Sequence, residues 1–172
     1  MVISAGPCVV RSWHANDAAS LVEQADNPAI WRNVRDAFPS PYTSRDAAEW
    51  LAHVMGNVPE TDFAIDVGGH AVGAIGFVLQ NDIHRLSAEL GYWLGERYWG
   101  AGIASAAVRA VVPYAFQTYG LVRIFARVFS TNLASSRVLE KAGFSREATL
   151  RCAAVKEGRV LDEHLYVTLQ RH

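Results

Sequence analysis

The chain has 172 residues, with 16 lysines and arginines against 17 aspartates and glutamates, 51% hydrophobic residues and 19% charged residues. This length suits one domain with a sizeable core, and the composition excludes a disordered chain. A formal charge of -1 argues against a nucleic-acid partner, and no apolar stretch reaches the ~18 residues of a membrane span. Two cysteines, Cys8 and Cys152, cannot build a disulfide framework, and Met1–Pro7 lack the pattern of a signal peptide, so we expect a cytoplasmic protein.

The hydrophobic periodicity changes from helical to strand-like along the chain. In the first third we expect a strand at 8–11, a helix at 18–25, one or two helical turns at 30–34, and a helix that Thr43 or Ser44 caps. The rest predicts a hairpin of strands 63–67 and 72–79, a strand at 86–94, a helix from about 103 to 119, a strand at 123–129, a helix at 134–142, and strands at 144–150 and 161–169. The order indicates a mixed α/β domain with one large sheet.

A glycine-bearing turn lies between the predicted strand 86–94 and the helix after it, and it reads Arg97-Tyr98-Trp99-Gly100-Ala101-Gly102. The first N–H groups of a helix lack partners within the helix, and glycine lets a ligand approach the backbone, so such a turn can bind phosphate. By itself an Arg/Gln-x-x-Gly-x-Gly/Ala match arises by chance in roughly one chain of this length in six. The sequence completes neither the dinucleotide-binding Gly-x-Gly-x-x-Gly pattern nor a Gly-Lys-Ser/Thr phosphate loop.

A second element begins thirty residues after Gly102, where Asn132-Leu133-Ala134-Ser135 opens a predicted helix that ends at Gly143-Phe144. With both elements present, the chain resembles the GNAT superfamily of acetyl-CoA-dependent N-acetyltransferases. In that family the glycine turn holds the pyrophosphate of coenzyme A, and the asparagine meets its pantetheine arm.

Other segments resemble the RimJ/RimL-type branch, which acetylates the N-termini of ribosomal proteins. These segments are Arg11-Ser12-Trp13, Asp17, Phe38-Pro39-Ser40-Pro41-Tyr42-Thr43, Trp50-Leu51 and Glu89-Leu90-Gly91-Tyr92-Trp93-Leu94. The likeness extends from about Val9 to Leu169.

The resemblance implies a single domain over residues 1–172 with a mixed α/β (α+β) fold, in which a mostly antiparallel sheet of about seven strands is flanked by helices. It implies acetyl-CoA as co-substrate, with backbone N–H groups of strand 86–94 polarising the thioester carbonyl. The residues it assigns to the cofactor are Tyr92, Trp93, Leu94, Arg97, Tyr98, Trp99, Gly100, Ala101, Gly102, Ile103, Ala104, Asn132 and Ser135.

The thiolate side of the reaction departs from the usual family pattern. Many members carry a tyrosine seven residues after the asparagine, which protonates the departing thiolate, and here that position is Leu139. In the RimJ/RimL branch a serine three residues after the asparagine has been assigned the thiolate-stabilising role, and this position is Ser135. The other interpretation of Ser135 is a helix-start serine that satisfies backbone N–H groups.

Glu89, in the middle of strand 86–94, is the candidate general base. The other interpretations are a polar residue on a partly solvated strand face and a structural ion pair with Arg123 or Arg127 as its partner. A second glutamate that serves as base in the branch falls near Ala153-Ala154 here, which weakens a direct transfer of that mechanism.

The acceptor is less constrained than the donor. Trp31 and Tyr42 belong to the region that covers the acceptor groove in the family and are candidate substrate-binding residues, with core packing as the alternative. The six histidines show no paired ligand spacing, so no metal site is expected. The first acceptor class is a polypeptide α-amine. The alternatives are a small-molecule amine (an antibiotic, polyamine or amino acid) and a non-catalytic domain that binds coenzyme A, and the oligomeric state is left open, a homodimer included.

Overall fold

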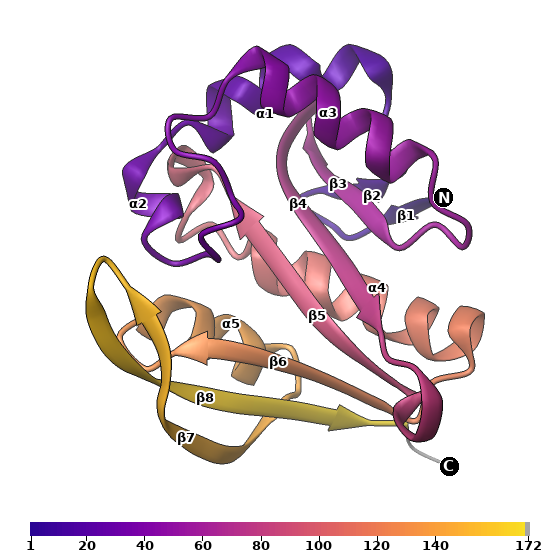
Figure 1. The fold of residues 1–172 in the computed structure, drawn as a ribbon. Coiled ribbons are helices and arrows are strands. Elements are labelled where there is room, and N and C mark those ends of the chain that lie inside the picture. The colour runs from indigo at the N-terminus through magenta and orange to yellow at the C-terminus, as the bar shows by residue number, and fades with distance from the viewer. Residues whose placement is uncertain (171–172) are drawn as a thin grey trace.

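Eight strands form one sheet in the order β1-β2-β3-β4-β5-β6-β8-β7 in the computed structural model, which describes residues 1–170 (Figure 1). The strands are β1 Val2–Ser4, β2 Val9–Arg11, β3 Asp62–Val67, β4 His70–Leu79, β5 Ser87–Leu94, β6 Arg123–Phe129, β7 Ser145–Lys156 and β8 Arg159–Leu169. The helices are α1 Ala18–Ala25, α2 Pro28–Trp31, α3 Ser44–Met55, α4 Ile103–Tyr119 and α5 Leu133–Lys141, with short 3-10 turns η1 Ala15–Asp17, η2 Asp82–His84 and η3 Glu96–Tyr98.

The helix ends follow the signals in the sequence. Thr43 is the N-cap of α3, where its hydroxyl accepts a hydrogen bond from the N–H of Asp46 and its own N–H donates to the Asp46 carboxylate. This reciprocal pair satisfies two of the free N–H groups of the first turn. Gly120 ends α4 with a φ of 63°, a left-handed conformation that glycine adopts without strain. Both predicted helix ends are confirmed.

The sheet is mostly antiparallel, as expected, and among the described residues only β5 and β6 pair in parallel. The count of about seven strands was one too low, because β1 pairs with β2 at the edge of the sheet. β1 has three residues, which is too short for an alternating pattern to identify from sequence. No helix within residues 1–170 is long and apolar enough to cross a membrane.

Two buried clusters lie on opposite faces of the sheet. The larger cluster joins the strands to α4 and α5, and it includes Phe63, Ile75 and Leu90. The smaller cluster joins β3 and β4 to α1 and α3, where the sheet presents the small side chains of Ala64 and Ala74. Small residues on that face let α1 lie close to β4, and Figure 1 shows α1 and α3 on one side of the sheet and α4 on the other.

Arg11 connects the start of α1 to the sheet. Its guanidinium donates two hydrogen bonds to Asp17, at 2.8 and 2.9 Å, and one to Asp66 at 2.8 Å. The side chains of Arg11 and Asp17 are only 13% and 8% exposed, so each charge depends on its partner. Burial opposes ionisation of Asp17, but hydrogen bonds from Arg11 and from the His14 N–H hold the pKa of Asp17 below its ordinary value. The Arg11 and Asp17 of the RimJ/RimL resemblance therefore have a structural role here.

Replacement of Arg11 by methionine should lower the free energy of unfolding by roughly 3 kcal/mol, because two buried carboxylates lose their counter-ion. The measurement is urea unfolding at pH 7. The depressed pKa of Asp17 makes its share of stability present near neutral pH, and this share is lost as pH falls through the folded-state pKa, below about 4. The difference between wild type and variant should therefore shrink in acid.

The matched control is Arg45→Met, which breaks an exposed ion pair with Glu49 on α3. This change should leave the urea midpoint where it is, because exposed pairs contribute little. If Arg11→Met unfolded at the same midpoint as Arg45→Met, the structural role of Arg11 would be wrong.

Candidate active site

The edge of β5 that faces β6 is open along most of its length. β5 pairs with β6 only through Ser87, Ala88 and Glu89, whereas it stays paired with β4 as far as Leu94. Figure 1 shows the two strands separating as they run away from this short contact. Every second backbone N–H and C=O group from Leu90 to Leu94 therefore points into the gap without a strand partner. The N–H groups among them can hold and polarise a carbonyl placed there.

Alternate side chains of β5 point to opposite faces of the sheet at this gap. Leu90 and Leu94 belong to the buried cluster under α4 and α5, and Tyr92 packs against it. Glu89 and Trp93 take the other face, where the Trp93 ring meets Phe38 edge-on with 5.7 Å between centroids. Because successive side chains of a strand point to opposite faces, Tyr92 lies on one side of the gap, and Glu89 and Trp93 lie on the other.

The N-terminus of α4 lies directly beyond the end of β5 and has the features of an anion site. Gly102 is the N-cap, no side chain caps the helix, and both Gly100 and Gly102 have a φ of 76°. A Cβ built on either glycine meets no atom within 4 Å, so the space beside the turn is free. The uncapped N–H groups and the positive end of the helix dipole fit the pyrophosphate of coenzyme A, with Ala101, Ile103 and Ala104 alongside.

The three residues before Gly100 have different surroundings. The Trp99 indole N–H donates to the carbonyl of Leu94 at 2.7 Å and so fixes the turn to the end of β5. Tyr98 packs against the larger buried cluster. Arg97, an exposed side chain, forms an ion pair with Glu23 of α1, so a phosphate would have to compete with this carboxylate for the guanidinium.

The start of α5 brings the Ser135 hydroxyl to the gap, where it meets the hydroxyl of Tyr92 from β5. Asn132 is the N-cap of α5 and accepts a hydrogen bond from the Ser135 N–H at 3.1 Å. The Ser135 hydroxyl is not the cap; it lies 2.7 Å from the hydroxyl of Tyr92. The interpretation of Ser135 as a helix-capping serine is therefore wrong.

The sequence assigned Tyr92 to the cofactor site, but it did not predict that the Tyr92 hydroxyl would meet Ser135. The position seven residues after Asn132 is Leu139, which is fully buried in the core and offers no hydroxyl. Ser135 lies one helical turn before Leu139 on the same face of α5, and Tyr92 brings a phenol to it from β5. Burial raises the pKa of Tyr92, although its hydrogen bond with Ser135 acts in the opposite direction, so the phenol keeps its proton.

Glu89 has a partner that the sequence did not suggest. Its Oε1 lies 3.5 Å from an Nη of Arg35, in the segment after α2. The predicted ion pair is present but the predicted partners are wrong, because Arg123 pairs with Glu147 and Arg127 lies over the Phe125 ring. The Glu89 side chain is 19% exposed, whereas that of Arg35 is 70% exposed. The Arg35 side chain can therefore move away from Glu89 without giving up a buried position of its own.

The two candidate acceptor residues differ in position. Tyr42 is 6% exposed and packs in the smaller buried cluster, where burial raises its pKa to about 12. This burial argues against direct contact between Tyr42 and an acceptor. Trp31 stays partly exposed at the end of α2, under the ammonium group of Lys156. No group of three or more His, Cys, Asp or Glu side chains within residues 1–170 is arranged to hold a metal ion.

Comparisons with known proteins agree with this geometry. Residues 8–145 match the family described as "Acetyltransferase (GNAT) domain". The uncharacterized N-acetyltransferase p20 of Bacillus licheniformis is 35% identical over 165 residues, which cover 94% of this chain and 92% of that protein. The ribosomal-protein-serine acetyltransferase of Escherichia coli is 33% identical over 97 residues, which cover 55% of this chain and 54% of that protein.

A solved structure of RimL, a ribosomal L7/L12 alpha-N-protein acetyltransferase in complex with coenzyme A, superposes with a TM-score of 0.86 and 18% identity over 98% of both chains. The uncharacterized N-acetyltransferase YoaA of Bacillus subtilis is 41% identical over 95 residues, so this chain matches about half (53%) of the length of that protein. The chain belongs to the GNAT acetyltransferase family. It is accordingly an N-acetyltransferase, and acetyl-CoA is its co-substrate.

The anion site at α4 can be tested with a pair of glycine variants. Gly102→Val should abolish the rise in melting temperature that acetyl-CoA causes, because a branched side chain would occupy the space beside the turn. Gly120→Val is the matched control, since it imposes a similar left-handed strain at the other end of the same helix. It should lower the melting temperature of the free protein yet keep the shift. A folded Gly102→Val protein with the full shift would place the phosphate elsewhere.

Proposed function

We propose that the protein transfers the acetyl group of acetyl-CoA to the N-terminal α-amine of a polypeptide. The observation that carries the proposal is the gap between β5 and β6, which has an anion site and two hydroxyls on one face and a carboxylate on the other. The similarity to an acetyltransferase of ribosomal-protein serine and to RimL supports a polypeptide acceptor.

The chemistry of the amine favours the same class. An α-amine with a pKa near ~8 is about one-tenth neutral at pH 7, which costs roughly 1.4 kcal/mol. A lysine side chain with a pKa near ~10.4 costs about 4.6 kcal/mol to neutralise at the same pH. A site in which the partly exposed carboxylate of Glu89 is the base is suited to the smaller of these two costs.

On the donor face, Ser135 and Tyr92 stabilise the departing thiolate. A thiol has an ordinary pKa near ~8.5, far below that of a buried phenol, so the thiolate can leave without taking a proton from either hydroxyl. The pair acts by hydrogen bonding: Tyr92 holds the Ser135 hydroxyl, and Ser135 donates to the developing negative charge. Tyr92 positions the Ser135 hydroxyl, Ser135 donates a hydrogen bond to the sulfur, and both hydroxyls keep their protons.

On the acceptor face, Glu89 receives the proton that the amine loses, directly or through one water. Arg35 lies near only one oxygen of the carboxylate, so the amine can approach the other oxygen or displace Arg35. The exposed position of Arg35 makes this displacement inexpensive. We place the reaction in the cytoplasm, in keeping with the free thiols of Cys8 and Cys152.

An acceptor screen tests the proposed class. Peptides with Ala, Ser or Met N-termini should give kcat/KM values at least roughly tenfold above those of polyamines and aminoglycosides, with release of free coenzyme A as the readout. The control is the same peptide with a blocked N-terminus and an internal lysine, which should be inert. Faster turnover of the small amines would assign the protein to that class instead.

Profiles of rate against pH separate the two faces. Glu89→Gln should lower kcat at pH 7 by roughly 10²-fold, and higher pH should restore part of the loss because more amine arrives neutral. Ser135→Ala and Tyr92→Phe should instead lower kcat over the whole pH range. The double variant should lose little more than either single one, because the two hydroxyls act as a unit.

Tyr119→Phe is the matched control for Tyr92→Phe. It removes another phenol, one that is hydrogen-bonded to the carbonyl of Glu60 at the opposite end of α4 from Gly102. Its kcat should match that of the wild type. Wild-type kcat in Glu89→Gln at pH 7 would sink the base assignment, and additive losses from Tyr92→Phe and Ser135→Ala would refute the coupled pair.

A further inference from the structure

The segment from Trp31 to Tyr42, called the strap below, crosses the acceptor face of β5. Arg35 reaches Glu89 with 3.5 Å between charged atoms, and Phe38 packs edge-on against Trp93. The strap therefore touches β5 at the carboxylate and again where the backbone edge is open. At its end, Tyr42 is fixed in the smaller buried cluster, and its N–H donates to Asp26.

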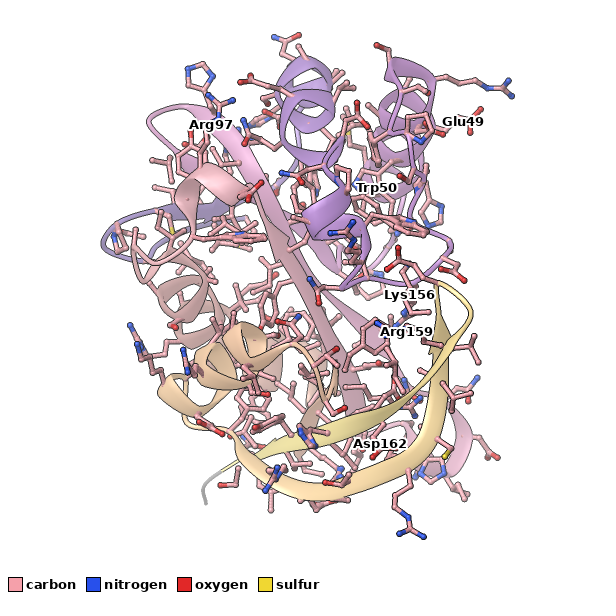
Figure 2. All side chains as sticks on the ribbon, turned by 90° about the vertical axis from the view of Figure 1, so that its left-hand side faces the viewer. Glu49, Trp50, Arg97, Lys156, Arg159 and Asp162 are labelled. Atoms are coloured by element: carbon pink, nitrogen blue, oxygen red, sulfur yellow. The ribbon has the colours of Figure 1, made fainter. Side chains whose placement is uncertain are left out.

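The tip of the β7–β8 hairpin holds the strap from the other side of the gap. Lys156 Nζ lies 2.8 Å from Asp36 Oδ1 and 3.8 Å from the centre of the Trp31 ring. Glu157 adds a looser ion pair with Arg32 at 3.8 Å. Figure 2 shows Lys156 and Arg159 at the hairpin tip, next to the N-terminal helices and their connecting segment.

The pattern of exposure at this tip is the reverse of an ordinary surface hairpin. Val155 and Val160, which pair across the two strands, are both 62% exposed, whereas the Lys156 side chain is 3% exposed. A buried ammonium group is tolerated only where a counter-charge or an aromatic face compensates for lost hydration. Asp36 and Trp31 supply both, so Lys156 is directed into the strap and away from solvent.

The closure depends on side chains alone. Among the described residues, the strap forms no strand pairing with β7 or β8, and its ion pairs and cation–π contact with the hairpin are the three interactions of Lys156 and Glu157 given above. Lys156 makes two of these three. Its loss should free the strap while the eight-stranded sheet stays intact.

We infer that Lys156 is a specificity-determining residue that fastens the strap across the acceptor face, so that only an amine on a slender chain reaches Glu89. The inference rests on the proposed function in that it takes the Glu89 face to receive the amine. A flexible polypeptide N-terminus meets this requirement. An amine next to a bulky or folded group requires the strap to be released.

The first measurement concerns the strap and needs no acceptor. In Lys156→Ala, amide hydrogens of residues 32–41 should exchange roughly tenfold faster than in the wild type, because a local opening becomes easier. Asp36→Asn removes the counter-charge but keeps the size of the side chain, and the Trp31 ring still faces the ammonium group, so it should give the same change. Arg159→Ala is the matched control, an exposed cation that pairs in register with Lys156. It should leave the exchange unchanged.

The second measurement concerns selectivity. A linear octapeptide with an N-terminal serine is compared with the same peptide closed into a hairpin by a disulfide. The wild type and Arg159→Ala should favour the linear form, and Lys156→Ala and Asp36→Asn should lower this preference in kcat/KM roughly tenfold. The lost preference should come from a lower KM for the closed peptide.

The outcomes separate the two proposals. Unchanged exchange in both Lys156→Ala and Asp36→Asn would overturn the role of Lys156, and so would faster exchange with an unchanged preference. A wild-type enzyme that acetylates neither peptide would contradict the polypeptide acceptor, and the preference is then measured between a linear and a branched alkyl amine. The exchange result stands in either case.

Discussion

The active site depends on one constraint, which is that β5 and β6 pair over three residues and then separate. Pairing as far as Glu89 fixes the two strands in one sheet, and the loss of pairing beyond it leaves backbone groups free. The parallel direction is what makes this geometry available. It requires a crossover, and α4 is that crossover, so its N-terminus necessarily begins where β5 ends. This connection therefore places the anion site beside the open edge.

The alternation of β5 distributes the chemistry between the faces of the sheet. Tyr92 faces the helices proposed to bind the donor, while Glu89 and Trp93 face the strap on the proposed acceptor side. The two buried clusters support these faces separately. On one face, large side chains pack under α4. On the other face, α1 and α3 pack against the small alanines of β3 and β4, and the ion pair of Arg11 with Asp17 lies at the edge of this cluster.

Most of the fold was predictable, because its signals are local. The helix start at Thr43, the helix end at Gly120 and the glycine turn at Gly102 each follow from a few neighbouring residues. The contacts that define the site join residues far apart in the chain. Tyr92 meets Ser135 across 43 positions, and Lys156 meets Asp36 across 120, so no periodicity or motif could identify either pair. The partner of Glu89 was assigned wrongly for the same reason.

β5 and β7 differ in their tolerance of changes in length. β7 already has two register shifts against β8, between Arg146 and Ala148 and between Leu150 and Ala154, so an extra residue there can be absorbed as a further bulge. β5 pairs with β4 without interruption from Ala88 to Leu94. One inserted residue after Glu89 would turn Tyr92 to the acceptor face and Trp93 to the donor face. Homologous chains should therefore differ by insertion in the hairpin while β5 keeps its length and varies only by substitution.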